Sequence, residues 1–213
     1  RTMVTNTTMA EELATHGMSN LTLWSRGVDT ELFRPRARDI LNVTRPVFLY
    51  AGRVAVEKNL EDFLRLSLPG TKVVVGDGPA RAHLEAHHPD VVFTGFKTGD
   101  DLAAHLASAD VFVFPSRTDT LGLVLYEAMA CGVPVATYPV QGPRNLITPG
   151  VTGSMDEDLG HAAREAVSLD GTACREYALA HSWRTATKEF VANLEPVPVA
   201  AGTATQSATI SED

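Results

Sequence analysis

Short apolar runs alternate with amphipathic stretches, and this alternation constrains the fold more than any other feature of the chain. The runs are rich in Val and Phe and occupy residues 46–51, 72–75, 91–94, 111–114 and 133–137. Apolar residues at helical spacing lie between them, as in 59–68 and 100–109. Strands that are apolar on both faces are typical of parallel sheets covered by helices. We therefore predict an α/β protein with a Rossmann-like parallel sheet and helices on both of its faces.

The loops that follow these strands contain most of the unusual residues. Because crossovers in parallel sheets are right-handed, all the strand-to-helix loops open at one edge of the sheet. These loops are 52–59, 76–79, 95–100 and 116–121. Ligands of open α/β sheets bind at this edge, so the sequence directs the search for a site to these four loops.

The most informative loop leads into a helix expected over residues 121–131. Asp119 and Glu127 stand eight residues apart around the start of that helix. N–H groups of its first turn, Gly122 and Leu123 among them, have no partner within the helix and can bind an anion. Taken alone, Asp119 is more often a helix cap and Glu127 a solvated helix residue. An anion site beside two carboxylates indicates a nucleotide-sugar pocket, where phosphates and hydroxyls are bound together.

Two cations, Arg53 and Lys58, lie five residues apart in the loop after the first strand of the sheet. Arg can bind a phosphate through two parallel hydrogen bonds, while Lys acts as a point charge. Taken alone they are more often solvated surface residues, and the loop lacks the P-loop sequence. Their place on the same sheet edge as Asp119 makes them candidates for binding a diphosphate.

Four segments, in this order, resemble motifs of the retaining glycosyltransferases of family 4 (glycosyl transferases group 1), which have the GT-B fold. The segments are 52–59, 76–79, 92–99 and 119–135, and the resemblance extends over about residues 20–194. The last segment departs from the family pattern, since Asp119 replaces a Glu and Leu121 a Phe. Its Thr-Asp-Thr version is similar to GDP-mannose-dependent α-mannosyltransferases and to sulfoquinovosyl transferases.

The resemblance implies three catalytic residues. Arg53 and Lys58 would bind the diphosphate of the donor and stabilise the charge that builds on it as it leaves. Asp119 would hold hydroxyl groups of the sugar. No metal and no other cofactor is expected, since the donor, a GDP- or UDP-sugar, is itself a substrate.

The resemblance also implies binding roles for residues around these three. Backbone groups near Lys97 and Thr98 would contact the base, although a plain strand-to-helix loop is nearly as good an interpretation. Glu127 would bind the ribose hydroxyls. N–H groups of Gly122 and Leu123 would add to the binding of the phosphates.

Residues 26–35 resemble the interdomain connector of GT-B enzymes, so the chain is expected to be the C-terminal, donor-binding half. We expect residues 1–30 to be the end of a truncated N-terminal Rossmann domain and 31–45 the connector. Residues 46–194 would form the nucleotide-sugar-binding domain, and 195–213, rich in Pro, Ala, Thr and Ser, a disordered tail. The first residue is Arg rather than Met, which we interpret as a start inside a longer protein.

Composition narrows the class of partners. The net charge of −8 gives no basic footprint for nucleic acid, and no apolar run approaches the ~20 residues that span a bilayer. Two cysteines, Cys131 and Cys174, are too few for a disulfide scaffold, which favours a cytoplasmic protein. A peripheral position at the inner membrane face is the alternative location. The Asp100–Asp101 pair is expected to cap a helix rather than to bind a metal.

The family resemblance implies a hexosyltransferase, with mannosyl as the favoured group, that acts with retention on a lipid or glycan acceptor. The acceptor site would belong to the missing N-terminal domain, so this piece alone should turn over little or nothing. Three alternatives stay open: a non-catalytic nucleotide-sugar-binding module, a sulfoquinovosyl or other UDP-sugar transferase, and a nucleotide-sugar epimerase of the same fold. The 119–127 motif argues against the epimerase.

Overall fold

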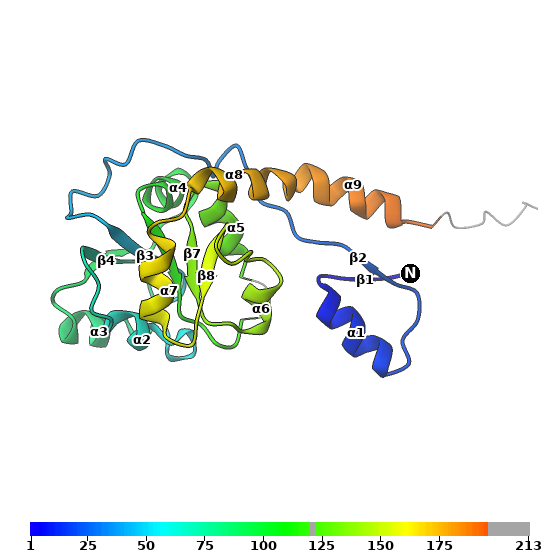
Figure 1. Cartoon of the computed structure of the whole chain (residues 1–213), viewed down its shortest axis with the longest axis horizontal. Helices are drawn as coiled ribbons and strands as arrows, with labels where there is room; N and C mark the ends of the chain where they lie inside the picture. The colour runs from blue at the N-terminus through cyan, green and yellow to red at the C-terminus, as the bar shows by residue number, and fades with distance from the viewer. Residues whose placement is uncertain (120–121, 196–213) are drawn as a thin grey trace, which may run out of the picture.

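A six-stranded parallel sheet forms the centre of the computed structural model, which describes residues 1–119 and 122–195 (Figure 1). The strand order is β5-β4-β3-β6-β7-β8, and every pair is parallel. This arrangement confirms the predicted fold class. The strands are β3 (Val47–Ala51), β4 (Thr71–Val75), β5 (Val92–Gly95), β6 (Val111–Phe114), β7 (Val135–Thr137) and β8 (Gly153–Met155).

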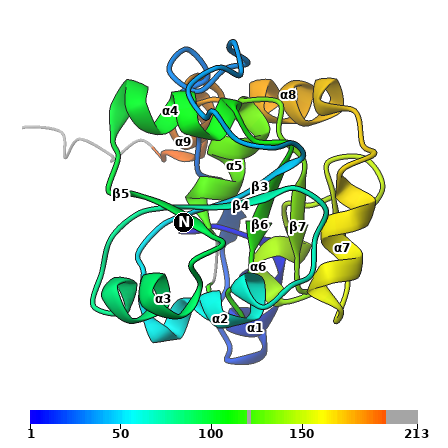
Figure 2. The same ribbon diagram turned by 90° about the vertical axis from the view of Figure 1, so that its left-hand side faces the viewer.

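Helices cover both faces of the sheet, as Figure 2 shows. One face packs against α4 (Gly99–Ala107), α5 (Leu123–Ala130) and α8 (Gly171–Ala180), and the other against α2 (Leu60–Leu64), α3 (Arg81–His87) and α7 (Leu159–Ala166). Side chains of β3 alternate between the two cores: Leu49 belongs to the first, and Phe48 and Tyr50 to the second. All five residues of β3 are buried. This explains why the strand is apolar throughout.

Two local expectations were wrong in detail. The helix expected over 59–68 is only Leu60–Leu64. A 3₁₀ turn, η1 (Val56–Lys58), and a left-handed Asn59 (φ 54°) precede it, and Lys72 donates to the carbonyls of Leu64 and Leu66 where it ends. The Asp100–Asp101 pair does not cap α4. Thr98 occupies the N-cap, and both carboxylates lie in the first turn, where they complement the helix dipole.

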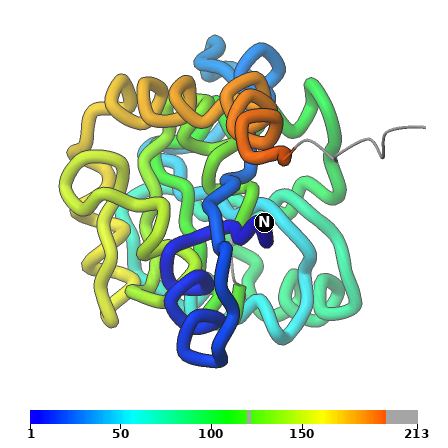
Figure 3. The backbone as a smooth tube through the Cα atoms, turned by 90° about the vertical axis from the view of Figure 1, so that its right-hand side faces the viewer, coloured from blue at the N-terminus to red at the C-terminus, as the bar shows by residue number. Residues whose placement is uncertain are grey.

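The first and last described segments form a small unit beside the main sheet. It contains the parallel strands β1 (Thr2–Val4) and β2 (Leu21–Leu23), with α1 (Thr7–Thr15) between them and α9 (Trp183–Asn193) alongside (Figure 3). The Trp24 ring lies 5.0 Å from the Phe190 ring, and its indole N–H donates to the Ala186 carbonyl at 3.0 Å. The predicted tail falls largely on residues 196–213, which lie outside the described residues.

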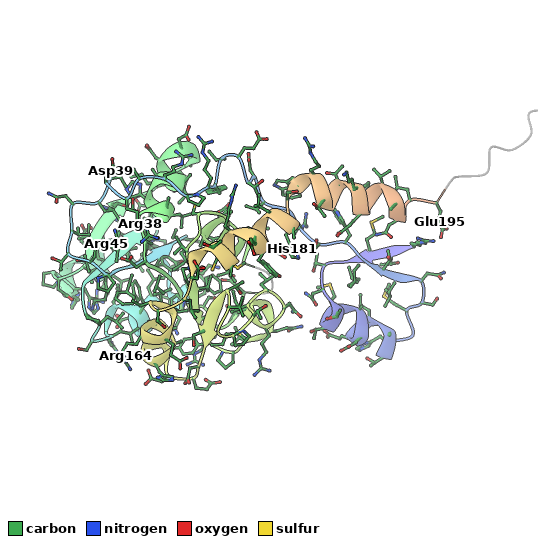
Figure 4. The ribbon with its side chains drawn as sticks, turned by 45° about the horizontal axis from the view of Figure 1, so that its top comes forward. Arg38, Asp39, Arg45, Arg164, His181 and Glu195 are labelled. Carbon is green, nitrogen blue, oxygen red and sulfur yellow. The ribbon has the colours of Figure 1, made fainter. Side chains whose placement is uncertain are left out.

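The chain passes twice between this unit and the sheet, at Val28 and at Ser182, where the two segments form a parallel bridge. The Val28 N–H donates to the His181 carbonyl at 3.1 Å, and Figure 4 places His181 at this junction. A Cβ at Gly27 would lie 2.5 Å from the Trp183 Cα, so only glycine fits there. Close backbone contact therefore joins the two crossings.

The segment between the crossing and β3 is tied down by arginines. Arg175 on α8 donates to the carbonyls of Thr30, Phe33 and Ala130. Further along, Arg38 and Arg45, labelled in Figure 4, both pair with Asp110 at the start of β6. Among the helices of the described residues, none is long and apolar enough to cross a membrane.

Candidate nucleotide-sugar site

A cavity of about 690 Å³ opens at the carboxyl edge of the sheet, between the loops that follow β3, β4, β5 and β6. Its volume is in the range of small-ligand sites. Five of the eight predicted site residues line it: Arg53, Lys58, Lys97, Asp119 and Gly122. The tertiary fold thus brings together residues from three loops that the sequence keeps far apart.

Lys58 and Asp119 form the closest charged contact of the cavity. The Lys58 Nζ lies 2.6 Å from the Asp119 Oδ1, and each side chain is only 25% exposed. Partial burial reduces the screening of this pair by water, so the attraction is stronger than at an exposed surface. A phosphate that binds Lys58 must therefore compete with the Asp119 carboxylate.

Arg53 is held much less tightly. Its guanidinium is 66% exposed and approaches the Glu57 carboxylate at 3.5 Å. The carbonyl of Arg53 accepts a hydrogen bond from the Tyr50 hydroxyl at 2.9 Å, which fixes the turn after β3. Burial raises the pKa of Tyr50, and the nearby Asp119 and Glu57 carboxylates add to this, so the phenol stays protonated. The Tyr50 hydroxyl therefore anchors the backbone of the Arg53 turn, while the guanidinium is exposed and only loosely paired with Glu57.

The turn after β4 approaches the turn after β3 so closely that glycine is required. A Cβ at Gly76 would lie 1.9 Å from the Gly52 carbonyl oxygen, and one at Gly78 would lie 2.3 Å from the Val54 oxygen. The Asp77 carboxylate accepts the Gly78 N–H at 2.7 Å, and this bond lowers its pKa. These glycines therefore shape the floor of the cavity by allowing the two loops to meet.

Three of the predicted residues do not line the cavity: Thr98, Leu123 and Glu127. Thr98 occupies the N-cap position of α4, and Leu123 is a 45% exposed residue at the start of α5. Glu127 lies in the middle of α5, where burial raises the pKa of its carboxyl. Of the two departures from the family pattern, Leu121 lies outside the described residues.

Sequence reasoning missed several residues that line the cavity, among them Tyr50, Glu57, Asp77 and Phe96. Phe96 is 72% exposed, which is unusual for so large an apolar side chain. Position offers a signal for Phe96 and Asp77, because each stands in the first residues after a strand that ends at this edge. For Tyr50, a strand residue, the sequence shows only an apolar run.

The comparisons with known proteins agree with this geometry. The family described as glycosyl transferases group 1 matches residues 45–169, which is more than half of the chain. This chain belongs to the glycosyl transferases group 1 family. The match covers the sheet and all four loops of the cavity, so the family resemblance seen in the sequence is confirmed.

Relatives of this group 1 family member include two GDP-mannose-dependent α-mannosyltransferases. The one from Mycobacterium tuberculosis is 34% identical and the one from Mycolicibacterium smegmatis 37% identical, each over 92% of this chain and 57% of the relative. A sulfoquinovosyl transferase of Arabidopsis thaliana is 36% identical over 89% of this chain and 43% of its own length. The chain thus spans about half the length of the curated relatives it matches.

Solved structures confirm the GT-B type of fold for this group 1 chain. Sucrose-phosphate synthase of Thermosynechococcus elongatus superposes with a TM-score of 0.75 at 24% identity, over 89% of this chain and 56% of that one. HepE of Anabaena, in complex with UDP and glucose, gives a TM-score of 0.73 at 17% identity, over 89% and 61%.

Proposed function

We propose that this chain is the donor-binding half of an enzyme that transfers a hexosyl group, with mannosyl favoured, from a nucleotide diphosphate sugar. The observation that carries the proposal is the cavity in which Arg53, Lys58 and Lys97 converge with the Asp119 carboxylate. Cations suit the diphosphate, and a carboxylate suits sugar hydroxyls. An apolar-lined cavity of this volume suits a ligand of nucleotide size.

In the reaction, the bond between the anomeric carbon and the β-phosphate oxygen breaks. A bond to the acceptor hydroxyl oxygen forms on the same face of the sugar, which gives retention. The nucleoside diphosphate leaves with the bonding electron pair, and the proton of the acceptor hydroxyl passes to an oxygen of the leaving diphosphate. Lys58 and Arg53 stabilise the charge that grows on the leaving phosphate, in place of a bound metal ion. The N–H groups of Gly122 and Leu123 add to that stabilisation at the start of α5.

The remaining roles concern the nucleoside and the sugar. Backbone groups around Lys97 and Thr98 contact the base, and Glu127 binds the ribose hydroxyls. Asp119 releases Lys58 to the phosphate and accepts hydrogen bonds from sugar hydroxyls. The 2.6 Å contact between Asp119 and Lys58 supports this exchange, since Lys58 is the cation proposed to bind the phosphate.

GDP-mannose is the favoured donor because several relatives are GDP-mannose-dependent α-mannosyltransferases. A UDP-sugar is the second candidate, supported by the UDP complexes of the structural neighbours and by the sulfoquinovosyl transferase. The acceptor, a lipid or a glycan, binds the N-terminal half that the longer relatives suggest. A cytoplasmic location at the inner membrane face fits a lipid acceptor.

The test is transfer by the full-length protein with GDP-mannose, UDP-glucose and UDP-sulfoquinovose as donors. We expect GDP-mannose to give the highest rate of nucleotide release in the presence of a lipid or glycan extract, and NMR to show an α-linked product. The Asp119→Asn protein serves as the matched control. Nucleotide binding without transfer from any donor would instead establish a non-catalytic binding module.

A further inference from the structure

A closed ring of side-chain contacts joins three loops at the carboxyl edge of the sheet. The Asn59 amide donates to the Asp62 carboxylate at 2.6 Å and to the Pro115 carbonyl at 3.2 Å. The Tyr138 hydroxyl donates to the same Asp62 oxygen at 2.6 Å. The Arg117 guanidinium lies 3.5 Å from the centre of the Tyr138 ring, and backbone returns from Arg117 to Pro115.

This ring is next in sequence to the two charged groups of the cavity. Asn59 is the residue next to Lys58, and Arg117 stands two residues before Asp119. None of the ring's side chains lines the cavity itself. The ring can therefore affect the cavity without touching a ligand, through the position of the loops that hold Lys58 and Asp119.

The ring is built from strong contacts. The Asp62 carboxylate accepts two short hydrogen bonds, and charged acceptors form stronger bonds than neutral ones. Burial by itself would raise the pKa of Asp62, but the hydrogen bonds from Tyr138 and Asn59 outweigh it, so the pKa lies below its usual value. On the far side, Arg117 pairs with Glu157 at 3.4 Å. The Asp62 carboxylate thus stays ionised at neutral pH and accepts both hydrogen bonds of the ring.

Asn59 also sets the backbone conformation between η1 and α2. Its φ of 54° lies in the left-handed region, which Asn and Gly adopt more readily than other residues. This conformation ends η1 at Lys58 and starts α2 at Leu60. The side chain of Asn59 then reaches the Pro115 carbonyl across the sheet edge. One residue therefore directs the chain after Lys58 and fastens it to the loop of Asp119.

We propose that Asn59, Asp62, Arg117 and Tyr138 are positioning residues that hold the two loops carrying Lys58 and Asp119 in the arrangement that binds a sugar diphosphate. The inference rests on the proposed function of the cavity. Loops are usually the least constrained parts of a fold, and a site built on loops gains accuracy when side chains outside it lock them. The ring supplies that lock for the two loops whose charges meet.

The test uses Tyr138→Phe, Asn59→Gly and, as matched control, Tyr177→Phe in the full-length protein. Tyr138→Phe keeps the aromatic ring beneath Arg117 and removes only the hydroxyl. Asn59→Gly keeps the left-handed backbone and removes the amide. Tyr177 is half-buried on α8 and does not line the cavity. Amide hydrogen exchange in 56–59 and 115–119 reports the lock, while nucleotide affinity and the separate kcat and KM values report the site.

We expect both ring variants to speed exchange in these two loops and to weaken GDP or UDP binding by roughly tenfold, an effect typical of contacts within one network. The kcat should fall as well, because Asp119 moves with its loop. The control variant Tyr177→Phe should leave loop exchange, nucleotide affinity and kcat unchanged. Faster exchange with unchanged affinity and kcat would overturn the proposal, as would unchanged exchange. If the wild type binds neither nucleotide, the proposed function fails, and exchange alone still decides whether the ring locks the loops.

Discussion

The Lys58–Asp119 pair leads to a prediction about both the direction and the size of changes in nucleotide affinity. We expect Lys58→Ala to weaken GDP or UDP binding far more than Arg53→Ala. We further expect Asp119→Asn, added to Lys58→Ala, to restore part of the loss. The reason is that removal of Lys58 leaves the Asp119 carboxylate unpaired in the cavity, where it repels the phosphates.

The separations between the charges set the size of the expected change in binding free energy. Two unit charges 2.6 Å apart attract by roughly 1.6 kcal/mol in water and roughly 6 kcal/mol at an effective dielectric of about 20. Desolvation offsets much of this gain. A lost hydrogen bond to a charged group costs about 1.5–3 kcal/mol. A free carboxylate about 6 Å from a phosphate adds roughly 0.7 kcal/mol of repulsion per unit charge even at the dielectric of water.

Lys58→Ala should therefore cost about 2–4 kcal/mol of binding free energy. Arg53→Ala should cost about 1 kcal/mol or less, because the guanidinium is 66% exposed and its pairing is screened by water. Isothermal titration calorimetry measures nucleotide affinity for Lys58→Ala, Arg53→Ala, Asp119→Asn and the double variant Lys58→Ala/Asp119→Asn. The Lys58 and Asp119 variants together form a double-mutant cycle. Equal losses for Lys58→Ala and Arg53→Ala, or a double variant weaker than Lys58→Ala, would refute this reasoning.

Three further outcomes are expected. Glu127→Gln should raise the melting temperature near pH 7 but not at about pH 4. Burial raises the pKa of Glu127, so its ionisation destabilises the fold as pH rises through that pKa. An equal shift of the melting temperature at both pH values would argue against this. Hydrogen exchange should be faster in 1–20 and 183–194 than in β3, since α1 buries no residue and α9 only Ala186; equal protection would contradict it. Gly27→Ala should lower the free energy of unfolding by about 1–3 kcal/mol in urea titrations, because its Cβ would overlap the Trp183 backbone; unchanged stability would exclude that overlap.

The sequence alone determined the class of fold. Each core strand is a local run of apolar residues, and its burial on both faces leaves the same mark whatever its neighbours are. The loops at the carboxyl edge follow from handedness, which is a general property of crossovers. The sequence alone therefore assigns Arg53, Lys58 and Asp119 to one edge of the sheet.

The periodicity of apolar residues does not predict short or irregular elements. Strands β1, β7 and β8 have three residues each, and α6 (Gln141–Arg144) has four. Too few residues remain there for a period of 2 or 3.6 to be recognised; β7 was found only because Val133 and Pro134 extend its apolar run. The start of α2 at Leu60 depended on Asn59, whose left-handed backbone is stabilised by contacts to Asp62 and Pro115.

Only the tertiary structure decided which side chains meet. Lys58 and Asp119 are 61 residues apart, and Tyr138 and Asp62 are 76 apart, so neither contact leaves a local pattern in the sequence. The same holds for Trp24 and Phe190, which join the first segment of the chain to α9. Local propensity selects helices and strands, but packing of the whole chain sets distances between loops, and the chemistry of the cavity depends on those distances.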